Sequence, residues 1–565
     1  MAFRTAHVAL ATQKSAGNEY WMHLTILGIS VTLCCNYNIY NGRPIVTLSF
    51  SIIISKAPGI YKGLLRGRKT LATMSFWTTT YIKTANIDKA NRGVFLTALE
   101  KTLAFTQDAM AGIRWERLRS LARATVLKTL TNIERGELQI VCGQETWSFG
   151  RPYLLTLDGF SKPLEATVSI MDESVWTRLC LDADFGFADS FMLGLVEVSA
   201  LTDVFQIFVL NRKKLAELNT AISPIFKFIS YISNFRLANK VLGSKSNISA
   251  HYDLSNDLFA GFLSWDMTYS CAIFDDEAGG YNGDLREERF IAPPRKHQKE
   301  KRSYPPDDLE RGQLAKLHLI AKRARITKGS RVLEIGCGWG SFAILVAREY
   351  GAQVDTITIS EVQKVAVEEN IEAEGLSHAI TVHLVDYRDM PEAFHHAFDA
   401  VVSIGVMEHV GIEYMDQWFR QMSWAMKEEN SVKAFTMSTV PDTRWAMYST
   451  EVDFVRKYIY PGGQLSSVAT LVQSCCKAGL NVDTIENIGP HYARTLREWR
   501  YRFERNFNTH IAPSLQAQYP SLTQEDVEIF RRKWIYYFAY SEAGFGLNSI
   551  SDHVFTLTRE ANLRL

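Results

Sequence analysis

Apolar positions in the second half of the chain fall into alternating helix-like and strand-like runs. The pattern predicts a helix over Leu309–Ala324, a strand over Arg331–Ile335 and a second helix over Ser341–Tyr350. Further strand-like runs follow at Gln353–Ile359, Ile380–Val385 and Phe398–Ile404. Because alternating strands and helices are typical of a parallel sheet with crossover helices, residues 310–440 are expected to form a doubly wound α/β domain.

A different pattern comes earlier in the chain. Residues 110–135 are expected to form a helix, because apolar residues recur at spacings of three and four between Leu118 and Ile133. Strand-like runs follow at Leu138–Cys142 and Ala166–Met171, separated by loops that contain glycine and proline. This order predicts a small α+β accessory domain over residues 100–235.

Residues 1–75 are expected to form a hydrophobic and basic leader. No charged residue occurs from Tyr20 to Gly42, a length close to the roughly 20 apolar residues that a helix needs to cross a bilayer. Several polar side chains interrupt this stretch, and basic residues follow between Lys56 and Lys69, which favours the cytoplasmic side of a membrane for that flank. Three interpretations stay open: a membrane anchor, a cleaved targeting segment or a leader without a structural role.

The composition is that of a globular protein and narrows the choice of partners. Of 565 residues, 47% are hydrophobic and 22% are charged, and the formal net charge is +1, so the overall charge indicates no affinity for nucleic acid or another polyanion. The eight cysteines include no CxxC pair and follow no spacing typical of a disulfide framework or a zinc site. We therefore expect a reducing compartment and no structural metal.

A glycine-rich loop follows the first predicted strand of the α/β domain. Gly336, Gly338 and Gly340 stand where the strand passes into a helix, and Glu334 precedes them by two residues. Glycine lets the backbone turn sharply and approach a ligand closely. The G-x-G-x-G spacing differs from the G-x-G-x-x-G of dinucleotide-binding proteins and resembles that of class I methyltransferases, whose cofactor has no phosphate to hold. A plain turn is the alternative reading of the loop alone.

Polar side chains also follow the next predicted strands. The end of the second strand places polar groups where a ribose would lie, and Asp386, after the third, could accept a hydrogen bond from an adenine amine. Because the carboxyl ends of the strands in such a sheet form the ligand-binding edge, these groups and the glycine loop predict one cofactor site. The candidate cofactor-binding residues are Glu334, Gly336, Cys337, Gly338, Gly340, Thr358, Ser360, Gln363, Asp386, Tyr387 and Arg388.

Further motifs occur in a fixed order around the glycine loop. They are His251–Phe259, Met267–Ala272, Glu408–Gly411, Tyr460–Gly463, His491–Leu496 and Tyr536–Tyr540. This set resembles cyclopropane-fatty-acyl-phospholipid synthases and mycolic acid cyclopropane synthases over about residues 240–565, and residues 170–212 look like the accessory domain of the longer members. The resemblance implies a catalytic domain at 240–565, with a class I methyltransferase sheet and an inserted helical lid. It also implies S-adenosyl-L-methionine (SAM) as cofactor, with Tyr269 and Ser270 among its contacts.

The resemblance implies transfer of a methylene or methyl group from SAM to the double bond of an unsaturated acyl chain in a membrane phospholipid. Attack of the double bond on the sulfonium methyl leaves a carbocation on the acyl chain. Aromatic faces stabilise a cation by roughly 0.5–2 kcal/mol each, and by family position Tyr252, Tyr269 and Tyr460 are the candidates for this role.

A base must then remove a proton from the new methyl group before a ring can close. In the family this base is a bound bicarbonate, which the resemblance also implies here. Its side-chain ligands would be Cys271, Glu408 and Tyr492, with a backbone contact near Ser438.

Two positions depart from the family pattern. Alignment on Thr439 and Pro441 places Thr436 where many members have a histidine or glutamine that contacts the anion. Ser541 stands where many members have a cysteine, and a serine hydroxyl is a much weaker nucleophile than a thiolate. The departures bear on the cyclopropanation outcome more than on SAM binding.

Other functions stay open beside cyclopropanation. They are C-methylation of a sphingolipid base, N-methylation of a small amine, which would need no base for a methyl proton, and a catalytically silent protein that binds SAM and lipid. We expect a membrane phospholipid as substrate, no nucleic acid partner and a location at the cytoplasmic side of a membrane. The sequence leaves a homodimer open.

Overall fold

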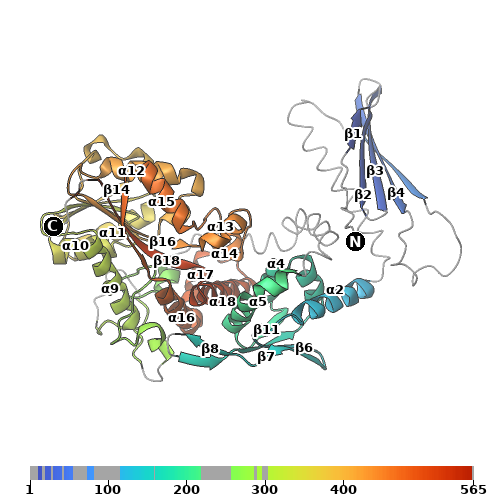
Figure 1. Ribbon diagram of the computed structural model, residues 1–565, viewed down its shortest axis with the longest axis horizontal. Coiled ribbons are helices and arrows are strands. Elements are labelled where there is room, and N and C mark those ends of the chain that lie inside the picture. The colour runs from blue at the N-terminus through green and yellow to red at the C-terminus, as the bar shows by residue number, and fades with distance from the viewer. Residues whose placement is uncertain are drawn as a thin grey trace. The chain divides into compact units, whose positions relative to one another are not determined.

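The computed structural model describes residues 11–14, 19–26, 29–40, 43–54, 73–81, 115–157, 160–217, 256–285, 289–295, 303–560 and 562. Its backbone contacts divide the chain into two compact units, Met1–Trp115 and Glu116–Leu565, and each is described by itself (Figure 1).

The first unit contains a five-stranded antiparallel sheet whose strands pair in sequence order. Its strands are β1 (Ala11–Lys14), β2 (Glu19–Ile26), β3 (Ile29–Tyr40), β4 (Arg43–Ile54) and β5 (Thr73–Tyr81). The described residues of the uncharged stretch, 20–26 and 29–40, therefore form strands and not a helix, in keeping with their many β-branched and aromatic side chains. No helix in the described part of the chain is long and apolar enough to span a bilayer. Membrane anchoring by residues 1–75 stays a prediction.

The second unit begins with a mixed helix and strand module. Its sheet has the order β11-β10-β6-β7, in which β10 and β6 are parallel and the other pairs antiparallel. Helix α5 packs on β6 and β10. The elements are α2 (Trp115–Leu130), β6 (Gly136–Cys142), β7 (Glu145–Arg151), the hairpin β8 (Leu154–Leu157) and β9 (Phe160–Pro163), β10 (Glu165–Ile170), α3 (Ser174–Leu181), α4 (Ala183–Met192), β11 (Val196–Val198) and α5 (Leu201–Glu217).

A seven-stranded sheet forms the centre of the second unit. Its order is β14-β13-β12-β15-β16-β18-β17, with β18 antiparallel to both neighbours. The order reverses between β12 and β15, where a doubly wound sheet opens a crevice for a ligand. The strands are β12 (Arg331–Ile335), β13 (Gln353–Thr358), β14 (Ile380–Leu384), β15 (Ala400–Ser403), β16 (Val432–Thr439), β17 (Asn481–Asn487) and β18 (Ser551–Thr558). The predicted parallel strands are confirmed, but the sheet continues past residue 440 into β17 and β18.

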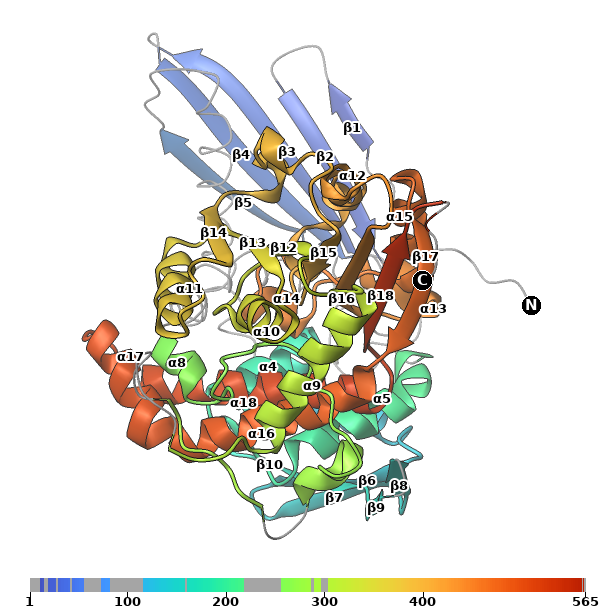
Figure 2. The same cartoon turned by 90° about the vertical axis from the view of Figure 1, so that its left-hand side faces the viewer.

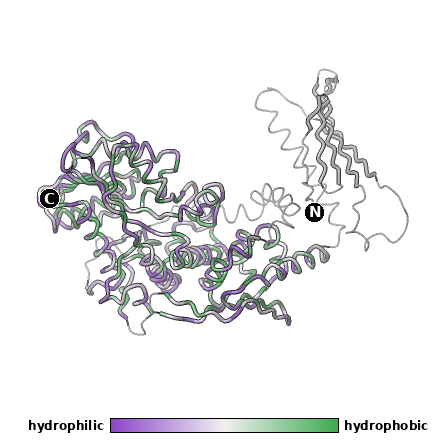
Figure 3. The backbone as a smooth tube through the Cα atoms, in the orientation of Figure 1, coloured by the Kyte–Doolittle hydropathy of each residue, from purple (hydrophilic) through white to green (hydrophobic). Residues whose placement is uncertain are grey.

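Helices cover both faces of this sheet (Figure 2). Alternate residues of β12 face opposite ways: Val332 packs in one core with Phe342 of α10, whereas Leu333 packs in another with Trp418 of α12. Hydrophobic residues recur along the strands and helices of this unit (Figure 3). The covering helices are α9 (Asp308–Arg323), α10 (Ser341–Tyr350), α11 (Glu361–Ala373), α12 (Met415–Ala425) and α15 (Val468–Lys477).

A helical layer is inserted between β17 and β18. It consists of α16 (Gly489–Asn506), a π-helical turn (Phe507–Ile511), α17 (Ala512–Gln518) and α18 (Gln524–Gly546). The short helices α8 (Asn256–Ala260), α13 (Asp442–Tyr448) and α14 (Phe454–Tyr458) accompany it. This layer matches the predicted helical lid.

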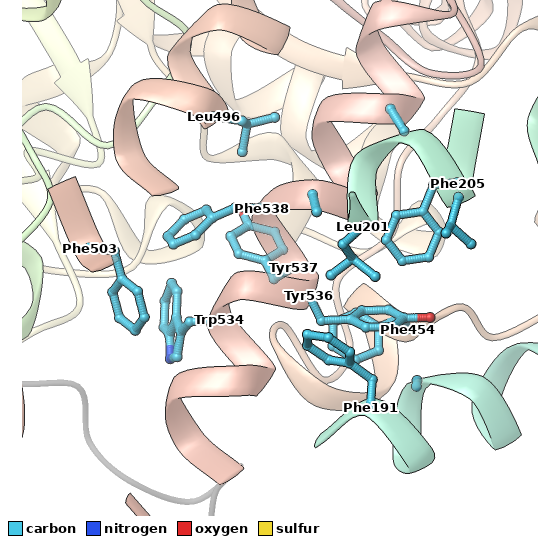
Figure 4. Close-up of a cluster of buried hydrophobic side chains, with 14 of the residues drawn as sticks. Phe191, Leu201, Phe205, Phe454, Leu496, Phe503, Trp534, Tyr536, Tyr537 and Phe538 are labelled. Carbon is cyan, nitrogen blue, oxygen red and sulfur yellow. The ribbon is translucent and has the colours of Figure 1, made fainter. Parts of the chain in front are cut away.

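The accessory module packs on this layer through an aromatic core (Figure 4). The ring of Tyr536 on α18 lies 4.3 Å from that of Phe454 on α14 and 4.9 Å from that of Phe205 on α5. Polar contacts reinforce the junction, since Thr202 donates a hydrogen bond of 2.8 Å to Glu542. The module and the helical layer therefore share one hydrophobic core.

A buried arginine ties α16 to the segments that precede the sheet. Arg494 is fully buried and donates hydrogen bonds to the carbonyls of Ala278 and Gly280, at 2.8 and 2.6 Å, and to Asp308, at 2.9 Å. Its guanidinium lies 3.9 Å from the centre of the Phe274 ring. One side chain thus connects the helical layer, the loop at 274–280 and the start of α9.

Candidate active site

The glycine loop joins β12 to α10 with a backbone that only glycine adopts easily. Gly336, Gly338 and Gly340 have φ angles of 85°, 52° and 91°, in the left-handed region. A Cβ atom at Gly336 would overlap Val406, whereas one at Gly338 would meet no heavy atom within 4 Å. The loop therefore leaves open space directly above Gly338, as a closely approaching ligand requires.

The side chains inside and behind the loop are buried. Glu334 accepts a hydrogen bond of 2.7 Å from Thr356 on β13, and burial raises the pKa of Glu334 to about 8. Burial also raises the pKa of the Cys337 thiol to about 12, so this cysteine stays a thiol. Both residues support the loop from the interior of the sheet.

The end of β13 carries a local polar network. Thr358 donates to the side-chain oxygen of Gln363 at 2.9 Å, and the Ser360 hydroxyl caps α11 by accepting from the backbone N–H of Gln363 at 3.2 Å. The three predicted residues therefore lie together beside the glycine loop.

The end of β14 carries a carboxylate that is held by an arginine. Arg388 donates to the two oxygens of Asp386 at 2.8 and 2.7 Å, and these hydrogen bonds lower the pKa of Asp386 from its ordinary value. The ring of Tyr387 packs on Trp418 at 4.7 Å. Asp386 is thus ionised, and its remaining lone pairs can still accept a hydrogen bond.

Three tyrosines meet through their hydroxyl groups. Tyr269 donates to Tyr537 at 3.3 Å, and Tyr460 donates to Tyr269. The ring of Trp499 lies 4.9 Å from that of Tyr269. Burial raises the pKa of all three hydroxyls, so the rings stay neutral. Tyr252, the remaining predicted member, lies outside the described residues.

This tyrosine cluster, Tyr269, Tyr460 and Tyr537, connects to the glycine loop through aromatic rings. The ring of Phe259 lies 5.2 Å from that of Trp339 in the loop and 5.1 Å from that of Tyr269. Tyr537 was not predicted as a site residue. The only signal for it in the sequence is its place in the Tyr536–Tyr540 motif.

The predicted anion ligands come from separate segments: Glu408 follows β15, Ser438 lies near the end of β16, Tyr492 lies in the first turn of α16, and Cys271 precedes α9. The backbone N–H of Ser438 donates to one oxygen of Glu408 at 2.7 Å, and the other oxygen is buried without a hydrogen-bond partner among the described residues. The Cys271 thiol donates to the carbonyl of Ile488 at 3.5 Å. The ring of Tyr492 stacks on Phe545 at 4.5 Å, and burial raises the pKa of both Cys271 and Tyr492.

Two buried ionisable groups at this site were missed by the sequence analysis. Lys316 on α9 donates to the Ser270 hydroxyl at 2.6 Å, and burial lowers the pKa of Lys316 to about 8. Asp552 on β18 is buried beside Ser438, and burial followed by the charge of Glu408 raises the pKa of Asp552. No sequence motif marks either residue.

The two residues that depart from the family pattern are both buried. Thr436 is buried on β16, and its hydroxyl oxygen accepts a hydrogen bond of 2.9 Å from the backbone N–H of Gly405. Ser541 is buried on α18. Within the described ranges, no group of three or more histidine, cysteine, aspartate or glutamate side chains could hold a metal ion.

Comparison with known proteins shows which family and which relatives the chain resembles. A family model described as mycolic acid cyclopropane synthetase matches residues 240–555. The chain is 33% identical over 320 residues to tuberculostearic acid methyltransferase UfaA1 of Mycobacterium tuberculosis, a match that covers 56% of this chain and 66% of that relative, just under two thirds of its length. It is 30% identical over 406 residues to cyclopropane-fatty-acyl-phospholipid synthase of Escherichia coli (strain K12), covering 71% of this chain and 90% of the relative.

A solved structure of the cyclopropane synthase MmaA2 from Mycobacterium tuberculosis aligns with a TM-score of 0.43 at 24% sequence identity, over 55% of this chain and 97% of that one. The family itself is shown by the model match over more than half of the chain and by the Escherichia coli relative, which is matched over nine tenths of its length. The chain belongs to the mycolic acid cyclopropane synthetase family of SAM-dependent methyltransferases.

Proposed function

We propose that this protein transfers a one-carbon unit from SAM to the double bond of an unsaturated acyl chain in a phospholipid. The observation that carries the proposal is the tyrosine cluster, in which Tyr537 is buried and Tyr269 and Tyr460 are half-buried. Its hydroxyls are neutral, and it is connected to the glycine loop through Phe259 and Trp339. Aromatic faces suit an alkene and the cation that forms from it. The reaction also requires that water be kept away, because water would trap that cation.

The glycine loop and the neighbouring strand ends would hold the cofactor. When bound, SAM supplies an electrophilic methyl group. The open space above Gly338 supports a close backbone approach, and the partly exposed groups of Gln363 and Asp386 provide an acceptor edge beyond the strands. The deeper Glu334 and Cys337 then shape the loop from below.

Bicarbonate is the base that the resemblance implies for this site. The unpartnered oxygen of Glu408 supports it, because a carboxylate oxygen can accept a hydrogen bond from the hydroxyl of bicarbonate. Thr436 offers less support than the histidine of other members, because its oxygen is engaged by the backbone of Gly405.

The product is the main alternative within this proposal. The relative from Mycobacterium tuberculosis is a tuberculostearic acid methyltransferase, and loss of the histidine at position 436 could accompany methyl branching in place of ring closure. We propose cyclopropanation as the first reading, since the groups expected around the base, Cys271, Glu408 and Tyr492, are all present.

The test is lipid analysis after expression in a bacterial host that makes unsaturated phospholipids but no alkylated ones. Mass spectrometry of the acyl chains should show a gain of CH2 for a ring and of CH4 for a saturated methyl branch, and proton NMR should identify ring protons. Unchanged acyl chains beside a folded, SAM-binding protein would contradict the proposal and favour a silent SAM- and lipid-binding protein.

Replacing Gly338 with valine is expected to abolish SAM binding, because the new side chain would occupy the open space above the loop. Gly375 is a matched control, since it also has a positive φ angle, 70°, and no heavy atom within 4 Å of an added Cβ, but it follows α11 away from the loop. Calorimetric titration should show SAM binding lost in Gly338→Val and kept in Gly375→Val. Equal SAM affinities in the two folded variants would contradict the assignment of the SAM site to this loop.

Ser541→Ala is expected to leave turnover nearly unchanged, within about twofold, because a buried serine on α18 fills space and its hydroxyl is a poor nucleophile. Initial rates of lipid alkylation at saturating SAM test this expectation. Loss of turnover in a Ser541→Ala variant that keeps its melting temperature would show that the Ser541 hydroxyl takes part in catalysis.

A phospholipid substrate implies contact with a bilayer surface, and we propose peripheral association at its cytoplasmic side. Vesicle co-sedimentation tests this proposal. Homodimer formation also stays a prediction, which light scattering of the purified chain tests.

A further inference from the structure

Lys316 is a buried cation on α9 that the proposed chemistry does not use. Its side chain is fully buried, and its ammonium donates a hydrogen bond of 2.6 Å to the Ser270 hydroxyl. The carboxyl groups whose charges act on it, Asp266, Asp552 and Glu334, form no ion pair with it in the described part of the chain. A buried ammonium without an ion-pair partner costs free energy, so its position calls for an explanation.

The hydrogen bond from Lys316 determines what the Ser270 hydroxyl can do. An ammonium can only donate, so the Ser270 oxygen is the acceptor in this bond and its own hydrogen is left for another partner. Ser270 is only 6% exposed, and its hydroxyl donates to no acceptor among the described residues. A buried hydroxyl donor without an acceptor is unfavourable, and a ligand that carries an acceptor oxygen would satisfy it.

The backbone around Ser270 is also held by α9. Gln313 donates to the Ser270 carbonyl at 2.8 Å, and the backbone N–H of Ile273 donates to the carbonyl of Gly312 at 2.9 Å. Gly312 and Gln313 precede Lys316 by four and three residues, so all three share one face of the helix. The segment that contains Ser270 therefore lies directly on this face, which fixes the position of its hydroxyl.

Contacts through two glycines place Ser270 beside the glycine loop. An added Cβ on Gly405, which follows β15, would lie 3.5 Å from the Ser270 side chain. The next residue, Val406, packs so closely on Gly336 that an added Cβ on this glycine would lie 2.3 Å from the valine side chain. Ser270 therefore lies at the edge where the strand order reverses between β12 and β15, the position at which a sheet of this kind binds its ligand.

We propose that Lys316 is a positioning residue for the carboxylate of SAM, which it holds through the hydroxyl of Ser270. This inference rests on the proposed function for the identity of its cofactor. The amino-acid part of SAM carries one carboxylate, and a carboxylate accepts a strong hydrogen bond from a hydroxyl. The charge of Lys316 polarises the Ser270 hydroxyl and compensates the carboxylate in a buried region, where charges interact more strongly than in water.

The neighbouring Cys271 is a predicted ligand of bicarbonate and makes different contacts. Its thiol donates to the carbonyl of Ile488, which precedes α16, whereas Ser270 packs on Gly405 beside the glycine loop. Adjacent residues of one segment would therefore serve two different anions. A measurement of cofactor binding in the absence of bicarbonate separates the two roles.

The experiment measures by calorimetry, in buffer free of bicarbonate, the binding of two ligands that differ only in the carboxylate. They are S-adenosylhomocysteine, the product of methyl transfer, and its decarboxylated analogue. In Lys316→Met, binding of S-adenosylhomocysteine should weaken by about 10–100-fold, as loss of a hydrogen bond to a charged group produces. Binding of the decarboxylated analogue should be unchanged, so the variant loses the preference of the wild type for the carboxylate.

Further variants separate the charge of Lys316 from its hydrogen bond. Lys316→Gln keeps an N–H donor for Ser270 without the charge, so it should lose less affinity for S-adenosylhomocysteine than Lys316→Met. Ser270→Ala should show the same selective loss, and because it removes only a hydroxyl, it keeps the test decisive if Lys316→Met does not fold. Lys322→Met is the matched control, because Lys322 is an exposed lysine on the same helix, and it should bind both ligands as the wild type does.

Each outcome supports or overturns the role of Lys316. Equal weakening of both ligands, in folded Lys316→Met or in Ser270→Ala, overturns it, because the side chain would then only maintain the local shape. Unchanged binding of S-adenosylhomocysteine in these variants overturns it as well. A wild type that binds S-adenosylhomocysteine selectively but alkylates no lipid refutes the proposed function and leaves this inference standing, whereas a wild type that binds neither ligand overturns both.

Discussion

Glu408→Gln is expected to lower turnover by ~10²–10⁴-fold, the range typical of losing a group that serves proton transfer. The amide can still accept the hydrogen bond that the Ser438 backbone donates to Glu408, so the local fold should persist. What disappears is the carboxyl oxygen that is buried without a hydrogen-bond partner among the described residues and would hold the proposed bicarbonate. SAM affinity should hardly change, because Glu408 is engaged with Ser438 and not with the glycine loop.

Single-turnover rates and calorimetric SAM titration on the same preparations check this prediction. Glu413→Gln is the matched control, because Glu413 is an exposed carboxylate five residues further along the same loop and should be silent. Cys271→Ser should also lower turnover more than SAM affinity, since Cys271 is a predicted ligand of the anion and its thiol contacts Ile488 and not the glycine loop. Wild-type turnover in both Glu408→Gln and Cys271→Ser would contradict a role of the predicted anion site in proton transfer.

Arg494→Met is expected to lower the free energy of unfolding by about 3–5 kcal/mol, the cost of removing one partner from a buried ion pair. The guanidinium is fully buried, and its loss would remove the Arg494 hydrogen bonds to the carbonyls of Ala278 and Gly280 and to one oxygen of Asp308. Among the described residues, Asp308 would keep only its hydrogen bond from Arg311. The methionine fills much of the volume, so the effect reports the lost polar contacts more than a cavity.

Urea unfolding followed by intrinsic fluorescence measures this change. Arg348→Met is the control, because Arg348 forms a surface ion pair with Glu374, with side chains 48% and 47% exposed, and such pairs contribute about 0–1 kcal/mol. A similar small change in both variants would show that Arg494 is not needed to hold α16 to the segments before the sheet.

The first strands of the sheet could be predicted because glycine and polar residues mark where each apolar run ends. Arg331–Ile335 and Ser341–Tyr350 form the elements that the pattern predicted, since the glycines between them can only be a turn. Strand β17 escaped prediction because it is an edge strand with mostly half-exposed residues. Strand β18 escaped because its place is set by pairing with β16, far back in the chain.

Sequence motifs indicated some residues of the candidate site, and only the fold brings the others to it. Glu408 and Cys271 stand in recognisable motifs, so the sequence indicated them. Asp552 and Lys316 reach the site only through strand order and the packing of α9, and no spacing along the chain records that proximity. The hydrogen bond from Gly405 to Thr436 is likewise a product of the pairing of β15 with β16.

Strands β17 and β18 are adjacent and antiparallel although the whole helical layer lies between them in the chain. At the entrance of that layer, a Cβ on Gly489 would overlap Ser551 at its exit. In topological terms, the layer is one long connection between two neighbouring antiparallel strands. Lengthening a closed loop adds little entropic cost, about 0.6 kcal/mol per doubling. The length of the helical layer can therefore change at little cost to the pairing of β17 with β18.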